Sequence, residues 1–401
     1  MALSVEEALA KILEGAAVTA PETVPIAAAA GRVLAEDVTA RLTQPPFNSS
    51  AMDGYAVRSA DLKRLPVQLR LVGQAAAGHP YQGAVGPGEA VRIFTGAPVP
   101  ADTDTVIIQE NTDAADGHVV IREGRTDAGL NIRPRGGDFL EADTVLPAGR
   151  RLGPRELTLA ASAGHGELRV RRKPRVAILA TGDELVMPGT LPGPGQIVCS
   201  NPLGIAGLVA QSGAEALFLG IARDTRESLT QHVEQARDAD VLVTIGGASV
   251  GDHDLVAPVL QELGMSLSFW KIDMRPGKPL LHGRLGSQRV FGLPGNPVSA
   301  LICTRVFLVP YLRALVRLSD DESVALTAPL AVPVEANGPR QHYMRAMLQR
   351  TPDGRYEVLP AKSQDSSLLA TLAAADVLLV RPPNAPALEA GTLVNALRLD
   401  F

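Results

Sequence analysis

The sequence predicts a multidomain protein with a central α/β domain, a β-rich inserted domain and a small C-terminal β-barrel. A chain of 401 residues is long for one compact core. Between residues 175 and 263, apolar strand-like runs alternate with helical runs, which is typical of an open, mostly parallel sheet. Short β-like runs separated by Gly, Pro and Asp occur at residues 41–149 and again after residue 320. These three observations together predict the fold class.

Composition excludes several classes of function. A net charge of -5 gives no general basic field, so we expect no nucleic-acid partner. The two cysteines, Cys199 and Cys303, are too few for a disulfide framework and indicate a reducing cytoplasm. The longest apolar stretch, residues 298–316, is broken by Arg305, Pro310 and Arg313, so we expect no membrane segment.

Residues 4–13 have helical spacing, and Ser4 with Glu7 forms a capping-box pattern. In the α/β region strand-like runs at residues 175–182, 215–224 and 240–247 alternate with helical runs at 201–213, 226–238 and 254–263, and later strands are expected at 266–272 and 290–293. After residue 320 the strands shorten, and Asp353-Gly354 predicts a hairpin turn.

These patterns predict four domains. We expect a discontinuous linking domain at residues 1–40 and 141–172, a β-rich inserted domain at 41–140, an α/β domain at 173–318 and a β-barrel at 319–401. Whether the first helix packs on the α/β domain or on the linking domain stays open.

Three predicted strands end in loops rich in glycine and polar residues. These loops are residues 181–185 (TGDEL), 246–252 (GGASVGD) and 294–297 (PGNP). The carboxyl ends of parallel strands meet on one rim, and glycine loops leave backbone N–H groups free to bind an oxyanion. One such loop could be ordinary turn chemistry, but three from one sheet favour a phosphate site.

A cationic segment, MRPGKP at residues 274–279, follows a predicted strand. It carries Arg275 and Lys278, with Lys271 just before it. Fixed positive charge beside phosphate-type loops indicates an anionic substrate. Ordinary solvated surface cations are the alternative.

The β-rich region contains a loop, residues 45–56, that has neither helical nor strand periodicity. It mixes apolar residues with Asp53, and residues 131–138 (NIRPRGGD) form a comparable loop ending in Asp138. Irregular loops of this kind commonly carry function. The alternative is that both carboxylates are plain surface residues.

Taken together, these segments resemble the molybdopterin molybdenumtransferase family, which includes the C-terminal domain of gephyrin. The resemblance covers nearly the whole chain and rests on an ordered set of motifs: SAMDGYA at residues 50–56, TGAPVP at 95–100, NIR at 131–133, TGDEL at 181–185, GGASVG at 246–251, PGKP at 276–279 and PGNPVS at 294–299. It implies an elongated homodimer with its site between the α/β domain of one subunit and the β-rich domain of the other.

The resemblance implies that molybdate adds to the dithiolene of adenylyl-molybdopterin and that AMP is released with help from a divalent metal, expected to be Mg²⁺. It implies catalytic roles for Asp53, Thr95, Glu184 and Asp254. The expected ligand-binding set is Arg133, Asp138, Thr181, Gly182, Asp183, Gly246, Gly247, Ser249, Gly251, Lys271, Arg275, Lys278, Pro294, Asn296 and Pro297. It also makes transient contacts with molybdopterin adenylyltransferase and with molybdoenzyme chaperones conceivable.

Carboxylates beside phosphates require a bridging cation. Magnesium prefers oxygen ligands together with phosphate. We therefore expect Glu184, Asp252 and Asp254 to hold the metal, whereas Asp53 reaches in from the partner subunit.

The chain departs from the family pattern at a few positions. Asn48-Ser49 stands where many members have Asp-Asn, Gly137 where Glu is common, and Asp376 where Asn is usual. These changes put in doubt only loop hydrogen bonds and contacts of the terminal domain.

Histidines and cysteines give no second site. The seven histidines form no zinc-binding spacing, and a lone His253 is more often a solvated neighbour than a base. We expect Cys303 in the core, and Cys199 qualifies as a nucleophile only with a depressed pKa.

The residues bear on three alternative functions. Molybdopterin adenylyltransferase resembles only residues 175–316 and lacks the β-rich insertion. A molybdopterin-binding scaffold for partner proteins would need a linker or fused domain that the sequence does not offer. A nucleotide-binding regulator would not need acids beside phosphates.

Overall fold

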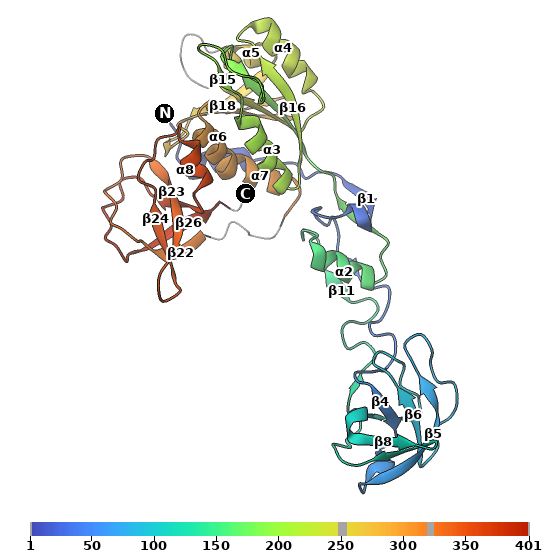
Figure 1. The fold of residues 1–401 in the computed structure, drawn as a ribbon. Helices are drawn as coiled ribbons and strands as arrows, with labels where there is room; N and C mark the ends of the chain where they lie inside the picture. The colour runs from blue at the N-terminus through green and yellow to red at the C-terminus, as the bar shows by residue number, and fades with distance from the viewer. Residues whose placement is uncertain (1, 248–254, 319–324, 400–401) are drawn as a thin grey trace.

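The computed structural model describes residues 2–247, 255–318 and 325–399 (Figure 1). The molecule is elongated: an α/β unit and a terminal β unit lie together at one end, a β-rich distal unit lies at the other, and a narrow linking unit joins them. We use these four unit names below for residues 173–318, 319–401, 41–140 and the segments 1–40 with 141–172, respectively.

The α/β unit is built on a six-stranded sheet of order β16-β13-β17-β21-β20-β18. The strands are β13 (Arg175–Thr181), β16 (Glu215–Ala222), β17 (Val241–Ile245), β18 (Met265–Lys271), β20 (Pro279–Leu285) and β21 (Gln288–Leu293). The first four strands in this order are parallel, and β20 runs antiparallel to both of its neighbours, β21 and β18, so β18 points in the same direction as the first four. The expected, mostly parallel sheet is therefore interrupted by one reversed strand, β20. The reason is a tight Gly286-Ser287 connection, with Gly286 at φ 62°, which forces β20 and β21 into a hairpin.

Helices cover both faces of this sheet. They are α1 (Val5–Leu13), α3 (Asn201–Gln211), α4 (Arg226–Gln235), α5 (Val256–Glu262), α6 (Pro297–Cys303) and α7 (Val309–Leu315). The core on one face takes side chains from α1, α3, α6 and α7, and the core on the other face takes them from α4 and α5. Helices on both faces explain why β17 and β21 are buried throughout.

Helix α1 packs in the α/β core, through Val5, Ala8 and Ile12. Its start has the capping box that the sequence predicts: the Glu7 amide donates to the Ser4 hydroxyl, and the Ser4 amide donates to the Glu7 carboxylate. Although residues 4–13 belong to the segment expected in the linking unit, they pack on the α/β unit, which answers the question that the sequence left open.

One helical segment, Pro297–Leu315, is long and apolar enough to cross a membrane by composition. It joins α6, a π-helical turn (Thr304–Leu308) and α7, and 83% of its apolar window is buried inside the protein. Its apolar character is thus accounted for by its place in the core.

The linking unit and the distal unit are mainly β-structure. The linking unit contains α2 (Pro154–Ser162) and the strands β1 (Pro21–Pro25), β12 (Glu167–Arg171), β2 (Val38–Thr39) and β11 (Thr144–Leu146), paired as β1-β12 and β2-β11.

The distal unit is a six-stranded sheet of order β7-β4-β6-β5-β9-β8. It is formed by β4 (Gly54–Val57), β5 (Val67–Ala75), β6 (Glu89–Ile93), β7 (Thr105–Ile108), β8 (Thr112–Ala115) and β9 (His118–Ile121), beside the short pair β3 (Ser49–Ser50) and β10 (Ile132–Arg133). Each unit has its own apolar cluster.

The terminal unit is a sheet curled into a small barrel. Its elements are β22 (Ala325–Pro329), β23 (Gln341–Arg350), β24 (Tyr356–Pro360), β25 (Val377–Arg381), β26 (Leu393–Arg398) and α8 (Leu369–Ala373). A bridge between Leu330 and Val358 brings the end of β22 back to β24 and closes the curl. The short strand β19 (Met274–Arg275) of the α/β unit pairs with β23, so this strand joins the two units.

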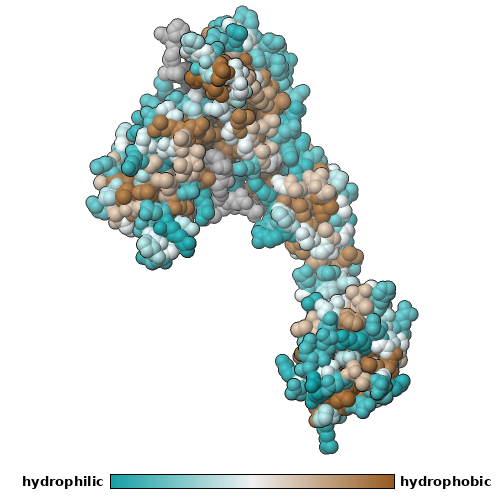
Figure 2. Space-filling view, in the orientation of Figure 1, coloured by the Kyte–Doolittle hydropathy of each residue, from teal (hydrophilic) through white to brown (hydrophobic). Residues whose placement is uncertain are grey.

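Among the apolar areas of the surface, one lies at the edge of the α/β sheet. The space-filling view shows apolar residues over α3 and β16 (Figure 2), and the exposed ones include Leu203, Leu217 and Phe218. Strand β16 is an edge strand, so this area has no neighbouring strand to cover it within the described chain.

Candidate active site

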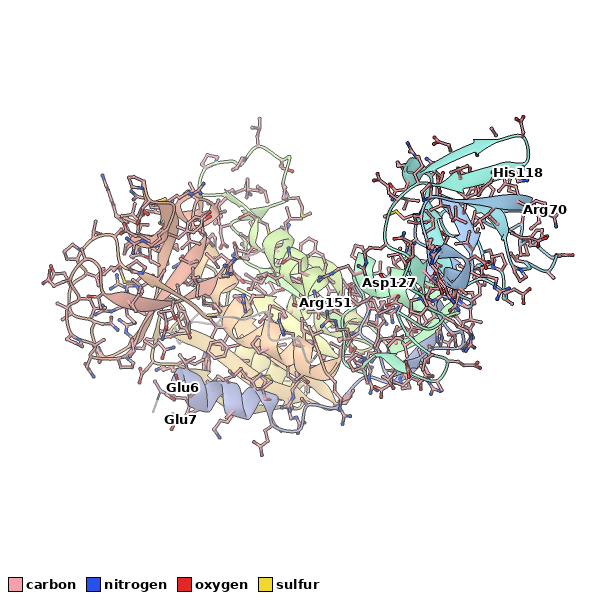
Figure 3. The ribbon with its side chains drawn as sticks, turned by 90° about the horizontal axis from the view of Figure 1, so that it is seen from below. Glu6, Glu7, Arg70, His118, Asp127 and Arg151 are labelled. Carbon is pink, nitrogen blue, oxygen red and sulfur yellow. The ribbon has the colours of Figure 1, made fainter. Side chains whose placement is uncertain are left out.

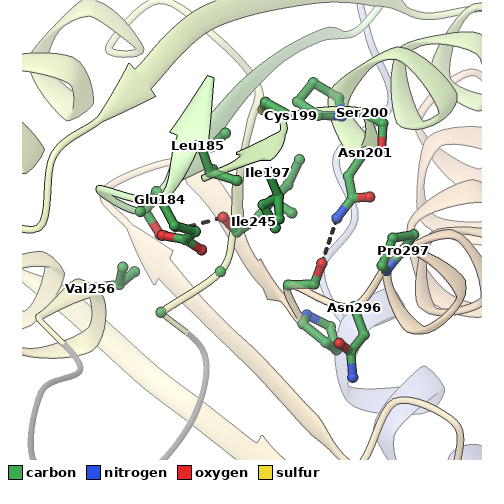
Figure 4. Close-up of a pocket in the computed structure, with 18 of the residues that line it drawn as sticks. Glu184, Leu185, Ile197, Cys199, Ser200, Asn201, Ile245, Val256, Asn296 and Pro297 are labelled. Carbon is green, nitrogen blue, oxygen red and sulfur yellow. Dashed lines mark hydrogen bonds between the residues drawn. The ribbon is translucent and has the colours of Figure 1, made fainter. Parts of the chain in front are cut away.

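The main cavity lies at the carboxyl ends of β13, β17 and β21 and has a volume of about 800 Å³ (Figure 4). The first loop contributes Thr181, Gly182 and Glu184 to its wall. The other two loops contribute their glycines and the residues next to them, namely Ile245, Gly246, Gly247, Pro294, Gly295, Asn296 and Pro297. The three loops that the sequence singles out therefore line one cavity.

Glycine is required where these loops approach one another. Gly246 has φ 91°, and a Cβ atom there would lie 2.8 Å from the carbonyl oxygen of Thr181. Gly182 has φ 146°, and a Cβ atom there would lie 2.2 Å from Oε2 of Glu184. The bare backbone thus leaves room for the Glu184 carboxylate at the mouth of the first loop.

Further contacts close the cavity. The side chain of Asn201, at the start of α3, donates to the carbonyl oxygen of Gly295 at 2.7 Å (Figure 4). Opposite it, β14 (Leu185–Val186) pairs with β15 (Ile197–Val198) and supplies an apolar wall of Leu185, Ile197 and Val198. Neither feature was predicted, because a pairing across ten residues of loop leaves no periodic signal.

Among the described residues, two carboxylates line the cavity. Glu184 was predicted, whereas Asp224, which follows β16, was missed because its strand end had no glycine-rich loop to attract attention. Asp183 does not line the cavity. Within the described ranges no group of three or more His, Cys, Asp or Glu side chains could hold a metal by itself.

Four predicted site residues, Ser249, Gly251, Asp252 and Asp254, lie outside the described residues, as does His253. The metal-binding set can therefore be traced in the structure only through Glu184.

Cys199 lies in the cavity wall but is unsuited to nucleophilic attack. Burial and the nearby Glu184 carboxylate raise the pKa of its thiol. Cys303 is fully buried, and burial raises its pKa to about 12. Both thiols therefore stay protonated at neutral pH.

A second, smaller cavity of about 360 Å³ adjoins the first, since Pro279 and Asn296 line both. It holds three cationic side chains: Arg275 and Lys278 from the predicted segment, and Arg340 from the terminal unit. Lys271 lines neither cavity, because it lies in the edge strand β18. Of the predicted cations, then, two of three face this cavity.

The terminal unit completes the smaller cavity with a polar loop, from which Gln364, Asp365 and Ser366 line the wall. Asn296 donates to the Ser366 hydroxyl at 3.2 Å, which connects the third loop to the terminal unit. The loop is organised by the fully buried Arg345, which donates to the side chain of Gln364 and to the carbonyl oxygens of Ser363, Asp365 and Leu368.

The predicted acids of the distal unit lie far from these cavities within one chain (Figure 1). Oδ1 of Asp53 accepts hydrogen bonds from the amide and the hydroxyl of Thr95, both at 2.8 Å. These two bonds, and then the nearby Arg92 guanidinium, hold the pKa of Asp53 below its usual value, so its carboxylate stays charged. Arg133 and Asp138 line a separate cavity of about 350 Å³ near the junction with the linking unit.

Models of known protein families match successive parts of the chain. The MoeA N-terminal region (domain I and II) matches residues 3–164, a probable molybdopterin binding domain matches residues 177–314, and the MoeA C-terminal region (domain IV) matches residues 327–399. A molybdopterin biosynthesis MoeA protein from Pyrococcus horikoshii has a crystal structure that superposes with a TM-score of 0.82 at 32% identity, covering 100% of both chains.

Curated relatives agree with this match. The chain is 36% identical to the molybdopterin molybdenumtransferase of Nostoc sp., covering 95% of this chain and 89% of that protein. It is 31% identical to the Bacillus subtilis enzyme of the same name, covering 91% of this chain and 87% of that protein. The protein described here belongs to the molybdopterin molybdenumtransferase family.

Proposed function

We propose that this protein inserts molybdenum from molybdate into adenylyl-molybdopterin, which yields molybdenum cofactor and AMP. The observation that carries the proposal is the pair of adjoining cavities that share Asn296, one lined by glycine loops with a carboxylate and the other by three cations. A substrate with a nucleotide part and a second, oxyanionic reactant requires two such compartments side by side.

The larger cavity suits the adenylylated pterin. Its volume of about 800 Å³ falls within the usual range for ligand pockets. The amides of Gly182 and Gly246 donate to the carbonyl oxygens of Ala222 and Leu293, so these two glycines serve the close approach of the loops. The amide of Gly247 has no acceptor among the described residues and is available to a pyrophosphate. The apolar wall of Leu185, Ile197 and Val198 offers a surface on which a flat ring system can pack.

The smaller cavity suits molybdate. Arg275, Lys278 and Arg340 supply positive charge, and the Ser366 hydroxyl, which accepts from Asn296, can donate a hydrogen bond to oxygen. Asp365 lies in the same wall, so the site is not uniformly cationic. In the proposed reaction the dithiolene sulfurs replace molybdate oxygens, which leave as water, and hydrolysis of the pyrophosphate bond releases AMP.

A magnesium ion fits the donor chemistry of the larger cavity. Magnesium is commonly held by one or two carboxylates plus substrate phosphates, and Glu184 and Asp224 provide two carboxylates in the wall. Asp252 and Asp254 follow the second loop in the sequence and would add further oxygen donors. When bound, the ion would offset the charge of the phosphates beside these acids.

We further propose that the protein works as a homodimer in the cytoplasm. Asp53 is a fixed, charged carboxylate, yet it lies at the opposite end of its own chain from both cavities. A partner subunit can bring its distal unit to the cavity, and the apolar area at Leu203, Leu217 and Phe218 is a surface that a second copy could cover. Other proteins of the same pathway would then bind the assembled dimer.

The experiment is anaerobic incubation of the purified protein with adenylyl-molybdopterin, molybdate and magnesium. AMP release and activation of a cofactor-free molybdoenzyme are followed together. We expect both products, loss of both in Asp53→Ala, and nearly unchanged nucleotide binding in that variant. The matched control is Asp113→Ala, an exposed carboxylate of the same unit that pairs with Arg122 and should leave turnover intact.

Two results would contradict the proposal. Ligand binding without AMP release under any divalent metal would indicate a molybdopterin-binding scaffold instead of an enzyme. A loss of nucleotide affinity in Asp53→Ala would show that Asp53 serves binding and not the chemical step.

A further inference from the structure

Arg92 of strand β6 lies directly beneath the turn that carries Asp53. Its guanidinium lies between two aromatic rings, with its central carbon 5.0 Å from the ring centroid of Tyr55 and 4.8 Å from that of Phe94. The register of the sheet explains this position, since Arg92 is opposite Tyr55 in the antiparallel pairing of β4 and β6. Cations held over aromatic faces are both attracted and restricted in rotation.

The guanidinium also bonds to two acceptors around the same turn. Nη1 donates to the carbonyl oxygen of Gly54 at 3.1 Å, and Nη2 donates to Oε1 of Gln109 at 2.5 Å. Gln109 in turn donates its backbone amide to the carbonyl oxygen of Asp53 at 3.1 Å. Arg92 therefore connects both sides of the Asp53–Gly54 peptide to the sheet.

The turn tolerates little adjustment elsewhere. A Cβ atom on Gly54 would lie 1.9 Å from the carbonyl oxygen of Ile107, so the backbone is pressed against β7. Thr95 holds Oδ1 of Asp53 through two bonds. Among the residues that the structure describes, none donates to Oδ2, so this oxygen remains available to a ligand.

From this geometry we propose that Arg92 is a positioning residue, which fixes the Asp53 turn so that the carboxylate presents its second oxygen to the cavity of a partner subunit. The inference rests on the proposed function, in which Asp53 acts in the chemical step. A planar guanidinium can bond to two acceptors while its faces stay on two rings, and a lysine ammonium cannot do both. The role therefore depends on the shape of the side chain as well as on its charge.

The experiment compares the full-length variants Arg92→Met and Arg92→Lys in the AMP-release assay. Misplacing a reacting group by about 1 Å can cost on the order of a hundredfold in rate, so we expect kcat to fall by roughly tenfold to a hundredfold in Arg92→Met. The KM values for molybdate and for the pterin nucleotide should change by less than about twofold, because Arg92 contacts neither cavity. Arg92→Lys should recover only a small part of the loss.

The matched control is Arg70→Met in the same unit. Arg70 is an exposed arginine of β5 that forms an ion pair with Glu89 and lies at the outer end of the distal unit (Figure 3). Its kcat and KM should equal those of the unaltered protein. If Arg92→Met does not fold, Arg92→Lys, which keeps the charge and most of the aliphatic length, carries the test alone.

A second readout separates positioning from general loss of structure. Because Arg92 helps to keep the pKa of Asp53 low, removing its charge should move the acid limb of the kcat profile to higher pH in Arg92→Met and much less in Arg92→Lys. A purely structural defect would lower the whole profile without moving the limb.

Each outcome decides between explanations. Unchanged kcat in Arg92→Met, or full recovery in Arg92→Lys, would overturn the inference. A raised KM with unchanged kcat would instead make Arg92 a substrate contact and also overturn it. The proposed function fails separately, if the unaltered protein binds the ligand without releasing AMP; the inference on Arg92 fails when the unaltered protein turns over and Arg92→Met keeps its kcat.

Discussion

The cavity region and the distal unit hold their functional groups in different ways. At the cavities, the groups come from the ends of buried strands and from bare glycine backbone, and two units meet around them. In the distal unit, Thr95 holds the exposed Asp53 carboxylate and Arg92 supports the turn that carries it. Both cavities lie at the other end of the chain. Substrate binding and the contribution of Asp53 to the chemical step therefore depend on separate parts of the chain. Substitutions at the cavities should change KM, whereas substitutions around Asp53 should change kcat.

The largest effect on stability is expected where the terminal unit meets the cavity. Arg345 is fully buried and bonds to a side-chain oxygen and to three carbonyl oxygens of one loop. Arg345→Met removes these four hydrogen bonds from the interior and should lower the unfolding free energy by about 3 kcal/mol. Thermal unfolding measures this loss. The exposed Arg340→Met is the control, and it should weaken anion binding without lowering stability; equal stability of the two variants would contradict the account.

The next prediction concerns the binding of molybdate in the smaller cavity. Lys278→Met removes a cation from the smaller cavity and should raise the dissociation constant for molybdate by roughly tenfold to a hundredfold. Lys271→Met is the matched control, because Lys271 lines neither cavity. Isothermal titration with molybdate measures both. Similar losses in the two variants would mean that general charge, and not this cavity, attracts the anion.

A third prediction concerns pH and the α/β core. Burial, and then the charges of Arg289 and Arg284, lower the pKa of His282 to about 4, and the imidazole packs between Phe269 and Phe291. The unfolded chain binds the proton near pH 6.5 and the folded one does not, so stability should fall as the pH drops from 6.5 to 4, by about 1.4 kcal/mol per pH unit.

Trp270, the single tryptophan of the chain, lies beside this core and reports its unfolding by fluorescence in urea. His282→Gln should reduce the dependence between pH 6.5 and 4 by about half, because burial also lowers the pKa of His342 to about 4 and that histidine still contributes. His118→Gln, at an exposed histidine of the distal unit, should leave the slope as it is. An unaltered slope in His282→Gln would contradict the assignment.

The smallest effect is expected on the outer surface of the distal unit. Arg70 is 63% exposed in its ion pair with Glu89, and such surface pairs are worth at most about 1 kcal/mol. Arg70→Met should therefore change stability by a few tenths of a kcal/mol and leave turnover unaltered. A marked loss of activity would mean that the outer face of the distal unit contributes to the site.

Local signals predicted the elements better than their assembly. The capping box at Ser4 and Glu7 and the glycine loops at positions 182 and 246 were readable because each depends on neighbouring residues. The antiparallel hairpin of β20 and β21 was missed because continuous apolar strands look alike in either direction.

Features that depend on distant pairings could not be read from the sequence. Arg340 and Ser366 reach the smaller cavity only because β19 pairs with β23 and because Arg345 folds the loop before α8. Asp224 reaches the larger cavity from the end of an edge strand. Sequence spacing carries no information on such contacts, and the distance between Asp53 and the cavities became evident only from the arrangement of the units.

The most direct test of the central claim combines two inactive variants. Asp53→Ala and Glu184→Gln carry their defects at opposite ends of the chain, and mixed dimers can be isolated by co-expression with two different affinity tags. If each site is built from the cavity of one subunit and the distal unit of the other, one of the two sites is intact, and AMP release should recover to about half that of the unaltered dimer. A mixed dimer as inactive as either variant would contradict the shared site.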